Sequence, residues 1–213
     1  MKSFNLLLGS LLLAGFTFTT SVAGSISEAG DGPFGPDRDQ PRVLLVSSLV
    51  DNADSLAGAA AKEVLVLRYD PRETSLEELE GMIRETLRGR RAASIAFAVH
   101  DHGENRFYLT SSASVSLPST LANAAQRDFW RKIGDMITED GRVDLLACNL
   151  ASGDNGTLLM ASLENAANRN FAASTNPTGN IRAGGDWLLE TDGIDAAGEY
   201  FNIAKLDSYA GLL

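Results

Sequence analysis

Val143-Asp-Leu-Leu-Ala-Cys148-Asn-Leu-Ala-Ser-Gly153 is an apolar run of strand length that ends in small and polar residues. Ile95-Ala-Phe-Ala-Val-His100-Asp-His102-Gly103 shows the same pattern earlier in the chain. Both runs are typical of buried parallel strands, and ligands of open α/β sheets bind at the carboxyl ends of such strands. Cys148 is the only cysteine, and His100 and His102 are the only histidines. The pattern therefore predicts that the most reactive side chains meet at one edge of a sheet.

The rest of the domain alternates between predicted strands and helices. Apolar runs predict six strands, at residues 42–49, 63–69, 94–99, 143–147, 171–174 and 187–191. Capping signals and helical spacing predict a short helix that opens at 51–54 and a helix that is capped by Thr74 or Ser75 and runs to about Arg88. They also predict a helix that follows 117–119 and runs through Ile137, and a helix at 156–168. Residues 106–110 are expected to form one arm of a short hairpin. This alternation indicates an α/β fold, a three-layer sandwich with a mostly parallel six-stranded sheet flanked by helices.

The first residues have the features of an export signal. Lys2 precedes an apolar stretch at residues 6–18, and Ser21-Val22-Ala23 places small residues before a cleavage site at Gly24. The stretch is shorter than the roughly 20 residues that a membrane span needs. We therefore expect a signal peptide at 1–23, a flexible leader rich in Gly, Pro, Asp and Ser at 24–40, and one domain at 41–213. The mature protein is expected to be periplasmic or extracellular, without membrane insertion.

The formal charge of −10 argues against nucleic-acid binding, which depends on basic patches. No metal site and no cofactor are expected, and the protein is expected to be a monomer. A single cysteine in an exported chain has three interpretations: a reactive thiol, an intermolecular disulfide, or a buried thiol that packs as a small apolar group.

The order of these motifs resembles two groupings of known proteins. A strand followed by His102-Gly103, and a strand ending at Cys148 46 residues later, resemble the caspase-like clan (clan CD) of cysteine peptidases, which includes gingipains, legumain and separase. More narrowly, residues 43–195 resemble the bacterial DUF4347 domain, which is typically found near the start of large secreted or surface-attached repeat proteins. The matching blocks are Val99-His100-Asp101-His102-Gly103, Leu146-Ala147-Cys148-Asn149-Leu150-Ala151, Ala173-Ser174 and Gly184-Gly185-Asp186-Trp187-Leu188-Leu189-Glu190.

The resemblance implies a catalytic dyad of Cys148 and His102. A thiolate is the nucleophile of such enzymes, and imidazole, which titrates near neutral pH, is a suitable base for it. The backbone N–H groups of Gly103 and Cys148 would form the oxyanion hole. Asp101 and Asn149 are the candidates for a third member. Leu146 stands where metacaspase-like enzymes carry an Asp that binds basic residues, so a preference for Arg or Lys is not implied.

Two conspicuous residues have structural interpretations. His100 and His102 would share a face of an extended strand, but His-Asp-His provides too few ligands for a closed zinc site. His100 is interpreted as a core or rim histidine. Trp187 is interpreted as a core residue, with Asp186 shaping the turn before it.

Two functions from different classes follow. The first is an exported cysteine endopeptidase that cleaves polypeptides, either a surface protein or its own leader. The alternative is a non-catalytic caspase-fold module for interaction or adhesion at the bacterial cell surface. For both functions the expected source is a Gram-negative bacterium.

Overall fold

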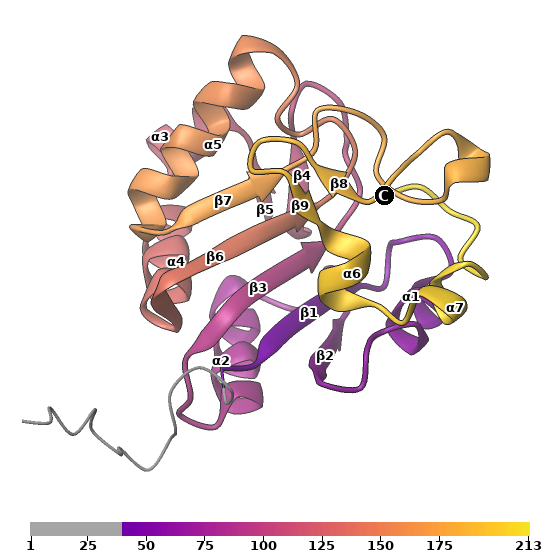
Figure 1. Ribbon diagram of the computed structural model, residues 1–213. Coiled ribbons are helices and arrows are strands. Elements are labelled where there is room, and N and C mark those ends of the chain that lie inside the picture. Colours follow the sequence, from indigo (N-terminus) through magenta and orange to yellow (C-terminus); the bar gives the residue numbers. More distant parts are fainter. Residues whose placement is uncertain (1–39) are drawn as a thin grey trace, which may run out of the picture. The chain divides into compact units, whose positions relative to one another are not determined.

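A parallel sheet of five strands forms the centre of the domain (Figure 1). The computed structural model describes residues 40–213, so the predicted signal peptide and most of the predicted leader lie outside the described residues. The strand order is β2 (Val64–Tyr69), β1 (Arg42–Ser47), β3 (Ala92–Ala98), β6 (Ile137–Leu146) and β7 (Asn170–Ala173). All four neighbouring pairs are parallel. The predicted α/β class with a mostly parallel sheet is confirmed.

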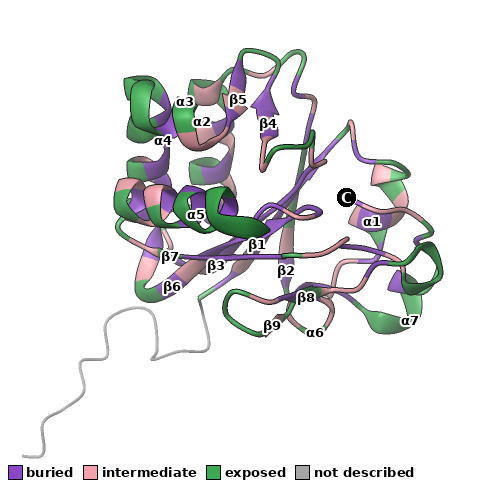
Figure 2. Ribbon diagram, turned by 90° about the horizontal axis from the view of Figure 1, so that it is seen from above, coloured by how far each residue is buried: buried purple, intermediate pink, exposed green. Residues whose placement is uncertain are grey.

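Helices cover both faces of this sheet, which gives three layers (Figure 2). One face carries α2 (Leu76–Leu87), α3 (Leu117–Ala122), α4 (Ala124–Asp135) and α5 (Gly153–Ala167). The other face carries α1 (Ala53–Gly58), α6 (Ala196–Tyr200) and α7 (Ile203–Leu206). No helix within residues 40–213 has both the length and the apolar character that crossing a bilayer requires.

Each face of the sheet has its own hydrophobic core. On the α2–α5 face, Trp130 is completely buried and packs edge-on against Phe97, Phe129 and Phe171, with ring centroids 5.1–5.5 Å apart. On the other face, Leu44, Ala98 and Leu146 of the sheet pack with Tyr200 and Tyr209. Alternate residues of one strand enter opposite cores, because successive side chains in a strand point to opposite faces.

Local signals in the sequence explain where α2 begins. The Ser75 side chain accepts a hydrogen bond from the Glu78 N–H, and the Glu78 carboxylate accepts one from the Ser75 N–H. This capping box satisfies two N–H groups that have no partner inside the helix. Leu79, Ile83 and Leu87 are buried along one side of α2, as their helical spacing predicts.

The single helix predicted to follow residues 117–119 and to run through Ile137 is wrong. Asn123 ends α3 and also begins α4, since its side-chain oxygen accepts the N–H groups of Ala125 and Gln126. Met136 ends α4, and Ile137 already pairs with Ala92 as the first residue of β6. Ile137 continues the helical spacing of the apolar residues before it, so apolar periodicity alone predicts that it belongs to the helix.

Residues 187–191, predicted as the sixth strand of the central sheet, do not join that sheet. Residues 187–191 contribute only β8 (Leu188–Leu189), which pairs in an antiparallel manner with β9 (Ile194–Asp195). Gly193 has a φ of +66°, which is characteristic of a tight turn between such strands. The predicted hairpin arm at 106–110 is confirmed as β4 (Phe107–Thr110), which pairs with β5 (Ala113–Val115).

Candidate functional site

The carboxyl ends of β3 and β6 lie side by side, as the sequence predicts. Ala98 is paired with Leu146, and the N–H of Val99 donates a hydrogen bond of 3.1 Å to the Leu146 carbonyl. Cys148 follows Leu146 by two residues, and His100 follows Ala98 by two residues. His100 and Cys148 therefore each lie two residues beyond the last paired residues of their strands, and His102 lies further along the loop that follows β3.

Backbone groups surround the Cys148 side chain, which is 8% exposed. The Thr178 N–H lies 3.3 Å from Sγ and donates to it, and the thiol lies 3.7 Å from the Thr178 carbonyl. Thr178 is itself fixed because its hydroxyl donates to the Ala147 carbonyl at 3.0 Å. The Cys148 N–H donates to the Leu213 carbonyl at 3.1 Å. The thiol thus lies in a buried niche between the end of β6 and two later segments.

The loop that carries His102 is more open to solvent. The imidazole of His102 is exposed and packs edge-on against Tyr108, with ring centroids 4.8 Å apart. Gly103 has a φ of +75°, and its N–H donates to the Asp101 carboxylate at 2.9 Å. Within residues 40–213, no hydrogen bond joins Cys148 to either histidine. The dyad and the oxyanion hole remain predictions, and both proposed oxyanion donors are bonded to groups of the chain itself.

Asn105 links the two loops and was not identified from the sequence. Its side-chain nitrogen lies 3.0 Å from the Asn149 carbonyl, 3.1 Å from the Leu150 carbonyl and 2.9 Å from the Ser152 carbonyl. Its φ of +52° is one that Asn tolerates better than most residues. The amide therefore holds the segment that follows Cys148 against the segment that follows His102. Its one signal in the sequence is an Asn two residues after a Gly, which indicates a turn but not its contacts.

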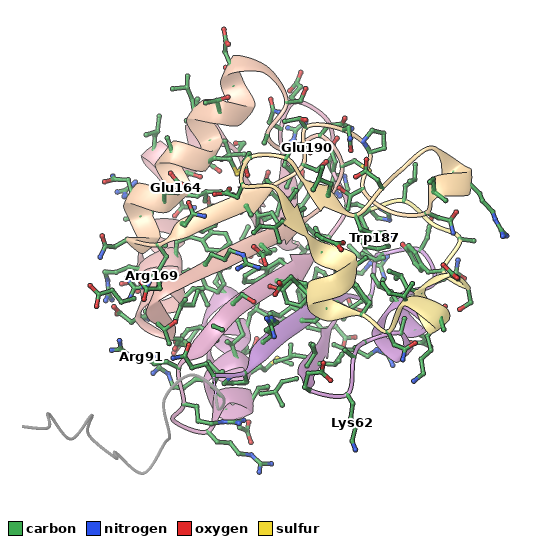
Figure 3. The ribbon with its side chains drawn as sticks, viewed as in Figure 1. Lys62, Arg91, Glu164, Arg169, Trp187 and Glu190 are labelled. Carbon is green, nitrogen blue, oxygen red and sulfur yellow. The ribbon has the colours of Figure 1, made fainter. Side chains whose placement is uncertain are left out.

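Three further residues that the sequence singles out form hydrogen bonds or packing contacts. Asp186 accepts a hydrogen bond of 2.9 Å from the Leu188 N–H, which spans Trp187; its role in the turn before Trp187 stays a prediction. Trp187 is partly buried beside α6 and packs against Phe201 and Tyr209 (Figure 3). Asn149, one candidate for a third catalytic residue, has a φ of +56° and donates its N–H to the Asn176 carbonyl at 2.9 Å.

A cavity of about 410 Å³ opens beside the His102 loop. It is lined by Glu104, Asn105, Arg106, Ser116, Leu117, Pro118 and Asn155. The Nε atom of Arg106 is buried and has no partner among the described residues. The lining combines a cation, an anion, amides and apolar carbon, so the cavity suits a ligand that has both polar and apolar groups. Within residues 40–213, no group of three or more His, Cys, Asp or Glu residues is placed to hold a metal ion.

Comparison with known proteins gives one family. Residues 43–213 match the family described as "Domain of unknown function (DUF4347)". No curated protein matches. Among solved structures, 62% of the chain is similar to the crystal structure of prephenate dehydrogenase from A. aeolicus in complex with hydroxyphenyl propionate and NAD+, at 13% identity and a TM-score of 0.33. The chain spans 40% of that dehydrogenase, and a likeness of this degree carries no inference about activity.

Proposed function

The chain belongs to the DUF4347 family, and from this premise we propose that it is an exported cysteine endopeptidase that uses Cys148 as nucleophile and His102 as base. The observation that supports the proposal is that Cys148 and the histidines follow adjacent parallel strands, β6 and β3, at the edge where α/β sheets bind ligands. Asn105 joins the loop that follows β3 to the loop that follows β6, and it would keep the distance between the two loops constant.

In the proposed reaction, His102 takes the thiol proton of Cys148, and the thiolate attacks the carbonyl carbon of a peptide bond. The carbonyl oxygen becomes an oxyanion, which accepts hydrogen bonds from the N–H groups of Cys148 and Gly103. The imidazolium of His102 then protonates the nitrogen of the leaving amine as the C–N bond breaks. Water, deprotonated by the same imidazole, hydrolyses the thioester and restores the thiol.

Before this reaction, three local contacts must change. The Cys148 N–H must leave the Leu213 carbonyl, the Gly103 N–H must leave Asp101, and the imidazole of His102 must leave Tyr108. Each is a single contact at a loop, and contacts of this kind often rearrange when substrate binds. The proposed substrate is therefore a polypeptide segment that is extended and that competes for these groups.

The test combines cleavage with thiol labelling. The mature protein is incubated with a mixture of unstructured peptides, and new termini are identified by mass spectrometry. Cleavage by the native protein, with none by Cys148→Ala or His102→Ala, supports the proposal. Absence of cleavage, together with iodoacetamide labelling of Cys148 that is slow at about pH 6.5 and rises only above about pH 8, shows an unactivated thiol and contradicts it.

One observation favours the alternative, a non-catalytic interaction module at the cell surface. The thiol is 8% exposed and bonded to Thr178, so in this conformation Cys148 packs as a small buried group. In that case Cys148→Ser should leave binding to surface proteins intact. Export is part of both proposals and rests on residues 1–23, so the secreted protein should begin at Gly24 when its N-terminus is sequenced.

A further inference from the structure

Residues 209–213 lie as an extended segment against residues 178–180. Leu212 forms an antiparallel bridge with Gly179. The Asn180 N–H donates to the Gly211 carbonyl at 2.9 Å, and the Leu213 N–H donates to the Thr178 carbonyl at 2.9 Å. The Asn180 side chain also donates to the Tyr209 carbonyl. The segment therefore binds along 178–180 in the way that an extended peptide binds to a strand edge.

The end of this segment lies at Cys148. The carbonyl of Leu213 accepts the Cys148 N–H at 3.1 Å, and the side chain of Leu213 is only 3% exposed. The Leu213 N–H and the Cys148 thiol approach the same carbonyl, that of Thr178. Leu213 thus covers the niche that contains the thiol. Its carbonyl accepts a hydrogen bond from the Cys148 N–H, which is one of the two predicted oxyanion donors.

These contacts correspond to those of a peptide substrate on a thiol enzyme. A substrate carbonyl must lie against the backbone donors that will stabilise its oxyanion, and the N–H of the nucleophilic residue is a common donor. The Leu213 carbonyl lies against this N–H of Cys148. A polypeptide bound in the same direction would therefore present an aliphatic side chain in the place of Leu213.

We propose that residues 209–213 are an autoinhibitory segment that fills the peptide groove along 178–180 and shields Cys148. The inference rests on the proposed peptidase function, because it treats the segment as a substitute for substrate. The ligand that displaces this segment from the groove is an extended polypeptide with an aliphatic residue at the position of Leu213.

Residues 210–213 can open without unfolding the domain, while Tyr209 stays in the core beside Tyr200. Besides Leu213 and Tyr209, the residues of the segment are exposed or half-buried, and its contacts to 178–180 are a few hydrogen bonds. The contact is close at Gly179, where an added Cβ would come within 2.5 Å of the Gly211 carbonyl oxygen. Segments held by few apolar contacts open locally at a lower free energy than the core strands.

The test measures how fast iodoacetamide labels Cys148 in the full-length mature protein. Leu213→Asn places an amide where an apolar side chain is buried, so the segment should detach without adding a charge near the thiol. We expect labelling to accelerate at least about tenfold, since weakening the segment by about 1.4 kcal/mol raises the open population by that factor. Ile203→Asn is the matched control, because Ile203 is 53% exposed on α7 and its replacement should leave the rate unchanged.

A synthetic peptide of residues 207–213 gives a second arm. Added to Leu213→Asn, it should slow labelling again, while the same residues in scrambled order should not. Faster labelling without any peptide cleavage would support the autoinhibitory segment and contradict the peptidase. An unchanged rate in a folded Leu213→Asn variant would overturn the autoinhibitory segment.

A measurement on the native protein covers the case in which the variant does not fold. Labelling through local opening should occur in the absence of urea and depend weakly on urea below the unfolding transition. Labelling that follows the urea dependence of global unfolding would show that the segment does not open by itself, and would also overturn the inference.

Discussion

The hydroxyl of Tyr200 on α6 donates a hydrogen bond to the carboxylate of Asp144 near the carboxyl end of β6, and both residues are completely buried. The Ser94 hydroxyl lies 2.5 Å from the same phenol oxygen. Asp144 also accepts a hydrogen bond of 2.9 Å from Arg142, which lies 3.6 Å from Glu199. This buried polar cluster of Ser94, Arg142, Asp144 and Tyr200 links α6 to the sheet by hydrogen bonds. In the sequence, α6 precedes the segment that covers Cys148.

Removing the Tyr200 hydroxyl should destabilise the fold. In Tyr200→Phe the buried Asp144 carboxylate loses a donor, and a buried acceptor left without its partner costs about 1–3 kcal/mol. The free energy of unfolding, measured by urea denaturation, should decrease by that amount. Tyr108→Phe is the control: Tyr108 is half-buried on β4, its hydroxyl has no hydrogen bond among the described residues, and its change should stay within about 0.5 kcal/mol.

Asp144 should also give stability a recognisable pH dependence. Burial raises the pKa of its carboxyl above the ordinary value, with Arg142 and Tyr200 opposing the shift. The folded protein therefore binds this proton more tightly than the unfolded chain does. Its contribution to stability is complete below the unfolded pKa of about 3.9 and is lost as pH rises through the folded pKa.

Comparison with Asp144→Asn isolates this effect from the other carboxylates. The unfolding free energy of the wild type minus that of the variant should fall as pH rises above about 4. Urea titrations at several pH values between about 3.5 and 7 measure it. A difference that grows with pH would mean that the pairing of Asp144 with Arg142 outweighs its burial.

The sequence predicts the sheet well because its strands are continuous apolar runs that end at recognisable turns. It predicts the order of elements from Arg42 to Ala173 but fails where two periodicities overlap. Ile137 satisfies helical spacing with Ile133, yet it is the first residue of β6. The apolar run at 187–191 suggests a buried strand, although Asp192-Gly193 is a hairpin turn signal that predicts the observed pair β8–β9.

The candidate site is only partly predictable, because its covering groups come from residues without distinctive chemistry. Cys148 and His102 are recognisable by residue type and by the strands before them. Thr178 and Leu213 contribute backbone groups to the niche, and any residue could supply those. Their approach to Cys148 depends on pairing between 178–180 and 209–213, a non-local contact that no periodicity in the sequence indicates.

Asn105 offers a direct test of how the two loops are held. Asn105→Gly keeps the positive φ accessible but removes the amide that three carbonyls share, so we expect a loss of about 1–3 kcal/mol. Asn168→Gly is a matched control, since Asn168 has the same φ of 52° at the exposed end of α5. The control should stay within about 0.5 kcal/mol by urea denaturation. Equal effects at both positions would show that backbone freedom, and not the shared amide, determines the loss.

The two histidines can be separated by the reactivity of Cys148. The family resemblance assigns the base to His102, whereas His100 follows the last pair of β3 and β6 by two residues, as Cys148 does. We expect His102→Ala to abolish iodoacetamide labelling at about pH 6.5, because the thiolate loses the base that generates it. His100→Ala should leave this labelling intact, since His100 is interpreted as a rim residue. The rates are measured in the Leu213→Asn background, where the thiol is expected to be accessible, and between about pH 5 and 9.

The shape of the pH profile separates catalysis from packing. An exposed residue such as His102 contributes little to stability, so its Ala variant should unfold within about 0.5 kcal/mol of the parent while losing the low-pH limb of labelling. Both variants should converge above about pH 9, where an ordinary thiol is ionised without help. Loss of the low-pH limb only in His100→Ala would transfer the role of base to His100. Retention of the limb in both variants would show that neither imidazole activates Cys148.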